Sequence, residues 1–352
     1  MPQHSDAAEF LKDLDSQVCL DVRSPKEYSR AHIPGAINFP LFSDDERAAV
    51  GLTYKQKGPE EAMLLGLDFV GPKMGGFIRE ARKLNPTRAP LSMYCFRGGQ
   101  RSQSLAWLLA KGGFEVRLLE GGYKAYRQHV LSHLQTPQEM VILSGCTGSA
   151  KTRLLHALRD RGEQIIDLEG LACHRGSAFG GYHQPADLVT EMFENRLHAV
   201  WEGLDRDRRV WVEDEGRTLG KVFVPDPFWF QMRSAPVIFL DIAQEHRVRF
   251  LVQEYGHYDR ALLAASVDRI ARRLGPENHK ACSQALQEGD YAEVVRRSLD
   301  YYDKAYLYCL KKREADPIFE LPLEGVDVET NADILIDFAD RVIGPKSVRS
   351  LD

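Results

Sequence analysis

The sequence predicts an α/β protein with two parallel-sheet domains and a helical region towards its C-terminal end. The length of 352 residues suits two domains, because most domains contain about 100–200 residues. Short apolar runs alternate with segments of helical apolar spacing, which is typical of parallel sheets covered by helices. Two such series follow one another, and we expect residues 1–133 and 134–352 to form the two domains.

The first series contains four short apolar runs, each of a length typical of a buried parallel strand. Between the last two runs, Ser102 to Lys111 shows helical apolar spacing at Leu105, Leu108 and Leu109. Gly112 follows at once and is expected to end that helix. We expect strands at residues 17–22, 36–39, 90–95 and 116–119.

A polar stretch at residues 133–139, which contains Pro137, separates the two series. Residues from about 245 to 315 are rich in charge and mostly helical in pattern, so we expect the helical region there. In between, four apolar runs predict the second sheet. These runs cover residues 140–143, 164–168, 209–212 and 236–241.

Composition indicates an ordinary globular chain. Hydrophobic residues make up 43% and charged residues 28%, and no apolar run reaches the roughly 18 residues that a membrane-spanning helix needs. The first residues are polar and acidic, unlike the basic and then apolar order of a secretory signal. We therefore expect a cytoplasmic protein that makes no contact with a membrane.

Cysteine spacing and net charge say little about ligands. The six cysteines are scattered, with no C-x-x-C pair and no Cys/His cluster at zinc spacing. In a reduced compartment we expect most of them to be buried thiols. The net charge of 46 − 51 = −5 does not indicate a nucleic-acid binder, nor does it exclude one, because phosphate attraction depends on local basic patches.

Cys95 stands between a predicted strand and a predicted helix, in the stretch MYCFRGGQRS. This position surrounds the sulfur with backbone N–H groups and the positive end of a helix, which favour a thiolate, a persulfide or a perselenide. Glycines allow the backbone to curl tightly around the sulfur. The alternative is a buried structural cysteine. The expected anion loop consists of Arg97, Gly98, Gly99, Gln100, Arg101 and Ser102.

The C-x5-R spacing from Cys95 to Arg101 fits both cysteine-dependent phosphatases and rhodanese-type transferases. The upstream stretch LDVRSPKEYSRAHIPGAINFP closely resembles the rhodanese signature, and EGGYKAY (Glu120 to Tyr126) resembles the usual end of that domain. The resemblance covers roughly residues 5–130. It implies a rhodanese-like N-terminal domain in which Cys95 is the catalytic thiol.

A second glycine-rich loop, GCTGSAKT, follows an apolar strand and precedes a helix, which is the context of a phosphate-binding P-loop. Its backbone N–H groups would surround phosphates, Lys151 would neutralise charge, and Thr152 would hold Mg²⁺. Ala150 replaces the usual glycine, and we expect it to be tolerated because the residue would be near helical geometry. The alternative is a glycine-rich turn without a ligand. The expected diphosphate-binding residues are Gly145, Thr147, Gly148, Ser149, Ala150, Lys151 and Thr152.

Two strand ends near this loop offer carboxylates for a metal ion. Glu213, Asp214 and Glu215 follow one strand, and Asp167 and Glu169 follow another. Either set is otherwise a group of solvated acids. Our expected metal ligands are Thr152, Asp167, Glu213 and Asp214. Two further stretches have two interpretations each. His174 to Ser177 is a phosphate-facing loop or a turn, and Pro227 to Phe230 belongs to the core or walls an apolar ligand pocket.

Three stretches together look like the tRNA 2-selenouridine synthase family: Asn38 to Gly58, Tyr94 to Ser102, and Leu143 to Thr152. Asp45 to Arg47 and Tyr54-Lys55 are not general rhodanese features, so they make the resemblance specific. The resemblance implies a transferase that replaces sulfur with selenium in wobble 2-thiouridine of tRNA, with selenophosphate as the donor. It also implies an S-geranylated intermediate made from geranyl diphosphate, because an alkylated sulfur leaves more easily than a thiocarbonyl sulfur.

The resemblance also suggests how the work is divided. The Gly145 to Thr152 loop, in a P-loop NTPase-like domain, would bind the diphosphate of the geranyl donor with Mg²⁺. Cys95 would handle selenium, either as a perselenide carrier or by directing selenophosphate. Selenophosphate synthetase is a further possible partner.

We expect the helical region to grip the anticodon stem-loop of tRNA and leave the wobble base free to be splayed out. Arg269, Arg272 and Arg273 fall at helical spacing on one face, with Lys280 beyond them. Arg296-Arg297 and Lys311 to Arg313 add positive charge. A solvated helix face with ion pairs is the alternative.

Three other functions remain open from the sequence. A sulfurtransferase fused to a P-loop small-molecule kinase predicts ATP turnover that depends on Lys151 and needs no tRNA. A rhodanese-like module that only binds a partner is disfavoured by the intact Cys95 loop. A C-x5-R phosphatase predicts hydrolysis of aryl phosphates that is lost in Cys95→Ser.

Overall fold

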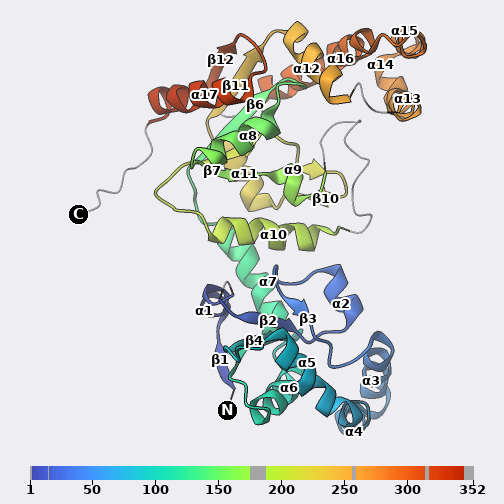
Figure 1. Ribbon diagram of the computed structural model, residues 1–352, viewed down its shortest axis with the longest axis vertical. Helices are drawn as coiled ribbons and strands as arrows, with labels where there is room; N and C mark the ends of the chain where they lie inside the picture. The colour runs from blue at the N-terminus through green and yellow to red at the C-terminus, as the bar shows by residue number, and fades with distance from the viewer. Residues whose placement is uncertain (1, 15, 175–187, 256–258, 314–316, 345–352) are drawn as a thin grey trace. The chain divides into compact units, whose positions relative to one another are not determined.

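The computed structural model describes residues 2–14, 16–174, 188–255, 259–313 and 317–344 (Figure 1). The chain divides into two compact units. The first contains Met1–Gln135 and Val189–Ala199, and the second contains Thr136–Leu188 and Val200–Asp352. The division lies close to the expected residue 133, but Val189–Ala199 returns to the first unit, which no local sequence pattern indicates. Among the described helices, none combines the length and the apolar character needed to cross a membrane.

The first unit is built on a five-stranded sheet with the order β1-β5-β4-β2-β3. Every neighbouring pair is parallel, which confirms the predicted sheet type. Four strands match the predicted runs, whereas β1 has no apolar run and was not expected. The strands are β1 Gln3–Ser5, β2 Val18–Asp21, β3 Ile37–Asn38, β4 Leu91–Tyr94 and β5 Val116–Leu119.

Helices pack around this sheet, and the residues between them form one core with Leu20, Met93 and Leu109 fully buried. The pair α3–α4 lies between β3 and β4 in the chain and turns at Gly58, whose φ of 97° suits glycine. The helices are α1 Ala7–Lys12, α2 Pro25–Arg30, α3 Asp44–Lys57, α4 Pro59–Val70, α5 Met74–Leu84, α6 Gln100–Lys111 and α7 Gly122–His133, with a short 3₁₀ helix at Gly71–Lys73.

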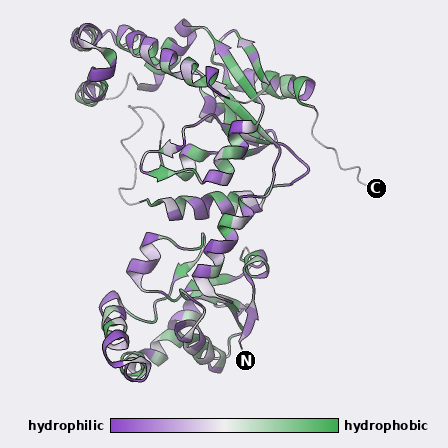
Figure 2. Cartoon of the chain, turned by 180° about the vertical axis from the view of Figure 1, so that it is seen from behind, coloured by the Kyte–Doolittle hydropathy of each residue, from purple (hydrophilic) through white to green (hydrophobic). Residues whose placement is uncertain are grey.

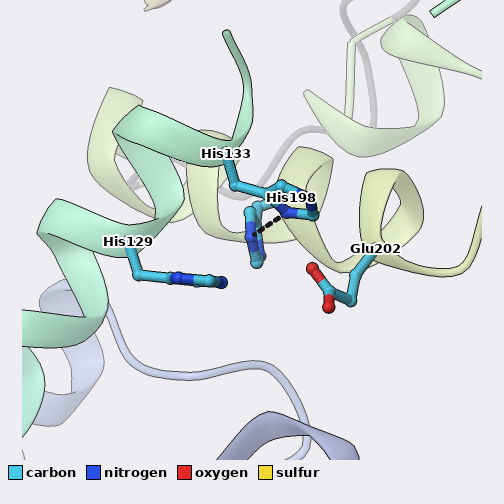
Figure 3. Close-up of side chains that lie close together, drawn as sticks. All are labelled: His129, His133, His198 and Glu202. Atoms are coloured by element: carbon cyan, nitrogen blue, oxygen red, sulfur yellow. Dashed lines mark hydrogen bonds between the residues drawn. The ribbon is translucent and has the colours of Figure 1, made fainter. Parts of the chain in front are cut away.

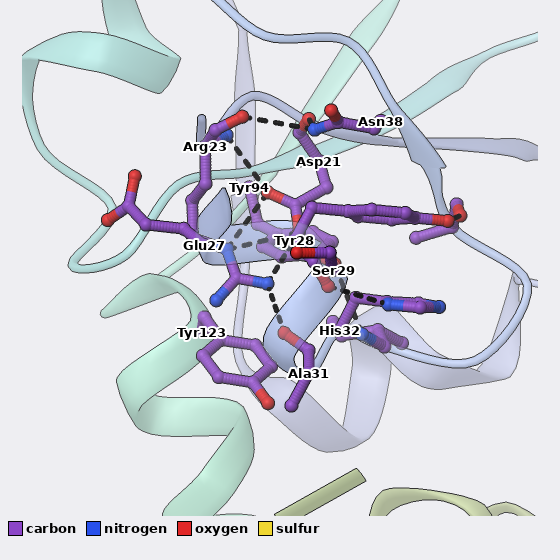
Figure 4. A network of polar contacts seen from close by, with 12 residues as sticks. Asp21, Arg23, Glu27, Tyr28, Ser29, Ala31, His32, Asn38, Tyr94 and Tyr123 are labelled. Atoms are coloured by element: carbon purple, nitrogen blue, oxygen red, sulfur yellow. Dashed lines mark hydrogen bonds and ion pairs between the residues drawn. The ribbon is translucent and has the colours of Figure 1, made fainter. Parts of the chain in front are cut away.

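The DVR part of the rhodanese signature forms a buried ion pair (Figure 4). The side chains of Arg23 and Asp21 are 3% and 0% exposed, and Arg23 Nη2 lies 2.6 Å from Asp21 Oδ2. The guanidinium also donates to the carbonyl of Ala31 at 2.7 Å and lies 3.9 Å from the centre of the Tyr123 ring. The signature thus supplies a scaffold that ties the end of β2 to α2 and α7.

We expect Arg23→Ala to lower the free energy of unfolding of the first unit by about 3–5 kcal/mol, because it leaves the Asp21 carboxylate buried without its partner. Urea unfolding monitored by circular dichroism measures this change. Lys83→Ala is the control. It removes an ion pair with Glu80 whose side chains are 75% and 51% exposed, so its cost is expected to stay below about 1 kcal/mol. Equal effects of the two variants would contradict a structural role for the buried pair.

The second unit contains another five-stranded parallel sheet, with the order β12-β11-β6-β8-β7. Its strands are mostly hydrophobic along their length (Figure 2), as expected for a sheet with both faces covered. All four predicted runs are strands, and β12 was not expected. The strands are β6 Met140–Gly145, β7 Gln164–Ile166, β8 Val210–Glu213, β11 Val237–Ile242 and β12 Ile318–Leu323, with a small hairpin of β9 Thr218–Leu219 and β10 Val222–Phe223.

Helices α8 and α17 pack together on this sheet around Leu155, Leu158 and Leu335. The described residues of the region expected to be helical, from about 245 to 313, consist mostly of helices. Part of it encloses a small core of its own, with Cys282 fully buried. The helices are α8 Lys151–Asp160, α9 Leu168–Leu171, α10 Thr190–Glu202, α11 Asp226–Ser234, α12 Gln244–Tyr255, α13 Arg260–Arg269, α14 Ala271–Leu274, α15 Pro276–Glu288, α16 Tyr291–Lys311 and α17 Val328–Val342.

Candidate functional sites

The thiol loop lies where the sequence predicts it, between β4 and α6. Cys95 follows the last residue of β4 and is 2% exposed. Gly98 adopts a φ of 64°, and Gly99 is the N-cap of α6. The buried hydroxyl of Ser102, in the first turn of that helix, donates to the Cys95 sulfur at 3.2 Å. The loop therefore brings the sulfur together with the positive end of a helix.

The N-terminus of α7 holds this loop in place. The N–H groups of Tyr123 and Lys124 donate to the carbonyls of Cys95 and Phe96 at 2.8 and 3.0 Å. Gly122 has a φ of 61°, and a Cβ atom there would lie 2.4 Å from the Cys95 oxygen and 2.4 Å from the Gly98 nitrogen. The EGGY stretch therefore has a physical role, because only glycine permits this close approach of two backbones.

Gly122→Ala is expected to destabilise the first unit by more than about 2 kcal/mol, since the methyl group would meet backbone atoms in a conformation that alanine disfavours. Gly76→Ala, in helix α5 with nothing within 4 Å of a Cβ, should be neutral or stabilising. Thermal unfolding of both variants, with alkylation of Cys95 as a probe of the loop, measures the difference. A Gly122→Ala protein with wild-type stability and wild-type thiol reactivity would refute the role of this contact.

The two arginines of the thiol loop differ in their surroundings. Arg101 donates to the Glu27 carboxylate at 2.7 Å. Burial opposes the ionisation of Glu27, but the hydrogen bond and charge of Arg101 outweigh it and lower the pKa of that carboxyl. Arg97 is exposed, and within the described residues no carboxylate lies at ion-pair distance from it. Arg97 is thus the cation of this loop that is available to an incoming anion, whereas Arg101 already joins the loop to α2.

A cleft of about 990 Å³ opens beside the thiol loop. One side is formed by the loop itself, including Cys95 and Arg97, and the other by the pair α3–α4. Its walls are mainly apolar, with a few cationic and hydroxyl groups. The stretches Asp45 to Arg47 and Tyr54-Lys55, which made the resemblance specific, lie on α3, and Arg47, Tyr54 and Lys55 line the cleft. The apolar lining residues include Leu41, Phe42, Val50, Met63, Leu67 and Val70.

The apolar part of this cleft was not predicted, although the sequence carries a signal for it. Leu52, Met63 and Leu67 on α3 and α4 line the cleft and are 47–59% exposed. Large apolar side chains gathered on a helix pair without a covering element indicate a binding surface. The signal in the sequence is this group of apolar residues in the segment between the rhodanese signature and β4.

The phosphate loop also lies at its predicted place, between β6 and α8. The Lys151 ammonium donates to the carbonyl of Gly145 at 2.8 Å, and the Ser149 hydroxyl donates to that of Cys146 at 2.7 Å. The expectation that Ala150 is near helical geometry is wrong in its handedness. Ala150 has a φ of 54° and a ψ of 32°, which is the left-handed region where glycine is usual. The loop therefore keeps the backbone of a glycine at the cost of local strain.

Residues more than 90 positions away support this loop, and no local pattern indicates them. The buried Arg247 donates to the carbonyl of Thr147 at 3.0 Å and forms an ion pair with Asp303 at 2.7 Å. The Tyr306 hydroxyl accepts a hydrogen bond from the N–H of Gly145 at 3.2 Å. Helices α12 and α16 of the helical region thus help to shape the loop.

Three carboxylates converge beside Thr152: Glu169, Glu213 and Glu215, with one oxygen of each within 4.8 Å of the others. The Thr152 hydroxyl donates to Glu169 at 3.4 Å. Burial, with a further contribution from Glu169, raises the pKa of Glu213 to about 8 and that of Glu215 to about 7. Neither oxygen of the buried Glu213 accepts a hydrogen bond of good geometry from the described residues. The nearby Thr152 hydroxyl only reduces the rise of the Glu213 pKa. An orphaned carboxylate in such a group fits a divalent cation.

The group combines residues from both strand ends that the sequence offered as alternatives. Two of the expected metal ligands have other partners. Asp167 accepts hydrogen bonds from the N–H of Gly170 at 2.7 Å and pairs with His156 at 2.8 Å. Asp214 forms an ion pair with Arg313 and accepts hydrogen bonds from two hydroxyl groups. The structure therefore brings Thr152 and Glu213 together with Glu169 and Glu215, and it leaves Asp167 and Asp214 outside this group.

The raised pKa of Glu213 has a consequence for stability. The unfolded carboxyl ionises at its ordinary pKa of 4.5, whereas the folded one keeps its proton to about 8. In EDTA, the free energy of unfolding is therefore expected to fall by a few kcal/mol as the pH rises through this window. Glu213→Gln should make the profile less steep, because only the contribution of Glu215 then remains, while Glu324→Gln, at an exposed position, should not. Urea unfolding between pH 5 and pH 8 measures the slopes, and parallel profiles for all three proteins would contradict this expectation.

The helical region presents only part of the basic surface that the sequence suggested. Arg269, Arg272, Arg273 and Lys280 are exposed, but they do not share one helix: α13 ends at Arg269, and Gly275 separates α14 from α15. Arg296 and Arg297 pair with Glu293 at 2.7 Å each. Arg313 is buried, so it adds nothing to this surface.

The structure decides between the two interpretations for only part of the stretches His174 to Ser177 and Pro227 to Phe230. Arg175 to Ser177 lie outside the described residues, so the interpretation of that loop stays a prediction. In the stretch Pro227 to Phe230, Phe228 is fully buried and Phe230 is 65% exposed. The core interpretation therefore holds for Phe228.

Comparisons with known proteins match a domain family to each of the two parts of the chain. Residues 5–129 match the rhodanese-like domain, and residues 138–328 match the tRNA 2-selenouridine synthase AAA domain. A crystal structure of the N-terminal domain of a putative ATP/GTP binding protein from Clostridium difficile 630 is 42% identical over 37% of this chain and 99% of that one, with a TM-score of 0.35.

Several curated relatives are similar over most of their length. A tRNA 2-selenouridine synthase from Hydrogenovibrio crunogenus is 34% identical, with 96% of this chain and 98% of the relative covered. The corresponding protein of Sulfurovum sp. is 32% identical, with 92% and 93% covered. That of Bdellovibrio bacteriovorus is 38% identical, with 79% and 74% covered. This chain belongs to the tRNA 2-selenouridine synthase family.

Proposed function

We propose that this protein is a transferase that replaces sulfur with selenium in the wobble 2-thiouridine of tRNA, through an S-geranylated intermediate. The observation that carries the proposal is the pairing, in one chain of this family, of a thiol loop beside an apolar cleft with a separate phosphate loop. A kinase or a simple sulfurtransferase needs only one of these. The names of the relatives support tRNA as the substrate.

The first step is alkylation. The thiocarbonyl sulfur of the base attacks the first carbon of the geranyl chain, the carbon–oxygen bond breaks, diphosphate leaves, and nitrogen 3 of the base releases its proton to water. The backbone N–H groups of the phosphate loop would hold the diphosphate, and Lys151 would turn from the Gly145 carbonyl towards its charge. Glu169, Glu213 and Glu215 are the residues that would hold Mg²⁺, and Mg²⁺ would neutralise charge on the leaving diphosphate.

The second step is exchange of the chalcogen. The selenium of selenophosphate, held against Cys95, attacks carbon 2 of the base. The carbon–sulfur bond breaks, and the sulfur leaves as geranylthiol with a proton from water. Hydrolysis of the phosphorus–selenium bond releases phosphate, and nitrogen 3 of the base takes up a proton from water. Arg97, exposed and without an ion-pair partner among the described residues, is suited to hold the selenophosphate anion.

The cleft beside Cys95 gives this second step its specificity in our proposal. A geranyl group is apolar, and Phe42, Val50 and Leu67 line the cleft with matching chemistry. Binding of the geranyl group there would bring carbon 2 of the base close to the thiol loop. The cationic residues Arg47 and Lys55 of the same cleft would contact the RNA backbone.

Reconstitution tests the proposal. Untagged protein is incubated with an anticodon stem-loop that carries 2-thiouridine, geranyl diphosphate, selenophosphate and Mg²⁺, and the nucleosides are analysed by mass spectrometry. We expect 2-selenouridine with both donors and S-geranyl-2-thiouridine when selenophosphate is omitted. Formation of 2-selenouridine at the full rate without geranyl diphosphate would exclude the intermediate. ATP turnover without RNA would favour the kinase alternative.

A further inference from the structure

Three histidines of the first unit converge at a place that neither step uses. His129 and His133 stand one turn apart on α7, and His198 is on α10. One ring nitrogen of each lies within 4.8 Å of the others, and the three rings point towards one another in Figure 3. Glu202, which the same figure shows one helical turn beyond His198, is exposed and belongs to the second unit.

The surroundings of these rings favour a bound cation. His198 is 1% exposed. The Nε2 atom of His129 is buried and has no hydrogen-bond partner within the described residues, which is costly for a polar atom. His133 Nδ1 and His198 Nε2 lie 3.1 Å apart. A hydrogen bond between two ring nitrogens needs a lone pair on one of them, so at least one of these rings is neutral.

We propose that His129, His133 and His198 bind one Zn²⁺ ion. Neutral imidazole nitrogens are preferred Zn²⁺ ligands at 2.0–2.1 Å, which places two ligands of a tetrahedral site about 3.3 Å apart. The observed 3.1 Å between His133 and His198 is close to this value. Two histidines four positions apart on a helix supply two ligands from one face, and water would take the fourth position.

This ion would lie too far from the thiol loop to take part in selenium transfer. We therefore assign it a structural role. Along α7, His129 lies about 9 Å and His133 about 15 Å beyond Tyr123, at 1.5 Å per residue. Near the ion, α7 and α10 are already joined by the ion pair of Arg127 with Glu194 and by a hydrogen bond from Asn195 to the Tyr123 hydroxyl at 2.9 Å. Since Tyr123 also holds the carbonyl of Cys95, the ion would fix the helix that supports the thiol loop.

Sequence spacing did not reveal this site, because its third ligand comes from a segment that the local pattern assigns to the other domain. His133 and His198 are 65 residues apart. The pair at positions 129 and 133 alone is common on helices without a metal.

Metal binding tests the inference directly. Protein without a polyhistidine tag is stripped with EDTA and dialysed against Zn²⁺, and the bound metal is quantified. Because the carboxylates beside Thr152 also fit a divalent cation, the measurement uses the Glu213→Gln background. We expect one Zn²⁺ per chain, and Co²⁺ should give the visible absorption of a tetrahedral site. Absence of Zn²⁺ binding at micromolar concentration would overturn the proposal.

Matched variants locate the ion. His129→Gln and His133→Gln should each weaken Zn²⁺ binding at least tenfold, whereas His279→Gln, in the second unit, should not. Unchanged affinity in folded His129→Gln and His133→Gln proteins would refute the site. If a variant fails to fold, X-ray absorption of the Zn²⁺-loaded protein without the histidine substitutions still identifies the ligands of the ion. Three nitrogen neighbours at imidazole distance are expected, and a shell of oxygen atoms alone would contradict them.

Discussion

Cys95→Ser is expected to stop selenium transfer while S-geranylation of the same RNA continues. The variant keeps the loop geometry, because serine is nearly isosteric, but a hydroxyl neither carries selenium nor stabilises it as an anion at neutral pH. The yield of 2-selenouridine should fall by more than about 10³-fold, as when other catalytic nucleophiles are removed. S-geranyl-2-thiouridine should accumulate, and mass spectrometry of the nucleosides measures both products.

Cys309→Ser is the control, since this thiol is exposed on α16, and it should react like the wild-type protein. Selenation by Cys95→Ser at the wild-type rate would disprove any role of this thiol. The mass of intact protein after incubation with selenophosphate tests the directing role, because selenide-level selenium becomes the outer atom of a perselenide only with a two-electron oxidant. A gain of one selenium atom on the wild-type chain, lost in Cys95→Ser, would contradict the directing role. A Cys95 that is needed but gains no mass indicates that it directs selenophosphate.

Lys151→Ala is expected to block the first step, so that 2-thiouridine stays unchanged even with both donors present. The ammonium lies against the phosphate loop, 2.8 Å from the Gly145 carbonyl, and its charge is the main local cation for a diphosphate. Loss of one charged donor to a developing anion reduces rates by about 10²–10³-fold. The rate of S-geranylation measures this loss.

Lys151→Arg tests whether charge alone is enough, because the longer and planar guanidinium does not fit the same position. Partial activity of Lys151→Arg with none in Lys151→Ala would support a charge effect. Lys111→Ala, at an exposed position at the end of α6, is the control and should be fully active. Normal S-geranylation by Lys151→Ala would show that the phosphate loop does not bind the geranyl donor.

Local sequence patterns predicted most of the two sheets and both loops, because each strand is a short apolar run and each loop joins a strand to a helix. Cys95, Ser102 and the Gly145 to Thr152 loop are set by neighbours in the chain, so their positions follow from it. Strands β1 and β12 were missed for different reasons. The first is only Gln3–Ser5, and the second, Ile318–Leu323, contains a proline at an outer position of the sheet.

What the sequence could not predict are the contacts made by residues that are distant in the chain. Arg101 looked like an anion ligand, but Glu27, 74 residues away, pairs with it. Asp214 was expected to be a metal ligand, but its carboxylate forms an ion pair with Arg313. In both cases the charged side chain does bind a group of opposite charge. That partner is distant in the sequence, so no local pattern indicates it, because a buried charge pairs with whichever residue the fold brings near. The spacing of Arg269, Arg272 and Arg273 predicted one continuous helix, but α13 ends at Arg269 and a separate helix, α14, begins at Ala271.

The central claim is that the thiol loop and the phosphate loop act on different steps, and supplying the intermediate tests it most directly. An anticodon stem-loop with S-geranyl-2-thiouridine already in place is given to each variant together with selenophosphate. Lys151→Ala should convert it to 2-selenouridine at the wild-type rate, and Cys95→Ser should leave it unchanged. If Lys151→Ala fails on this RNA as completely as it does on 2-thiouridine, or if Cys95→Ser succeeds, the two loops do not divide the reaction in this way.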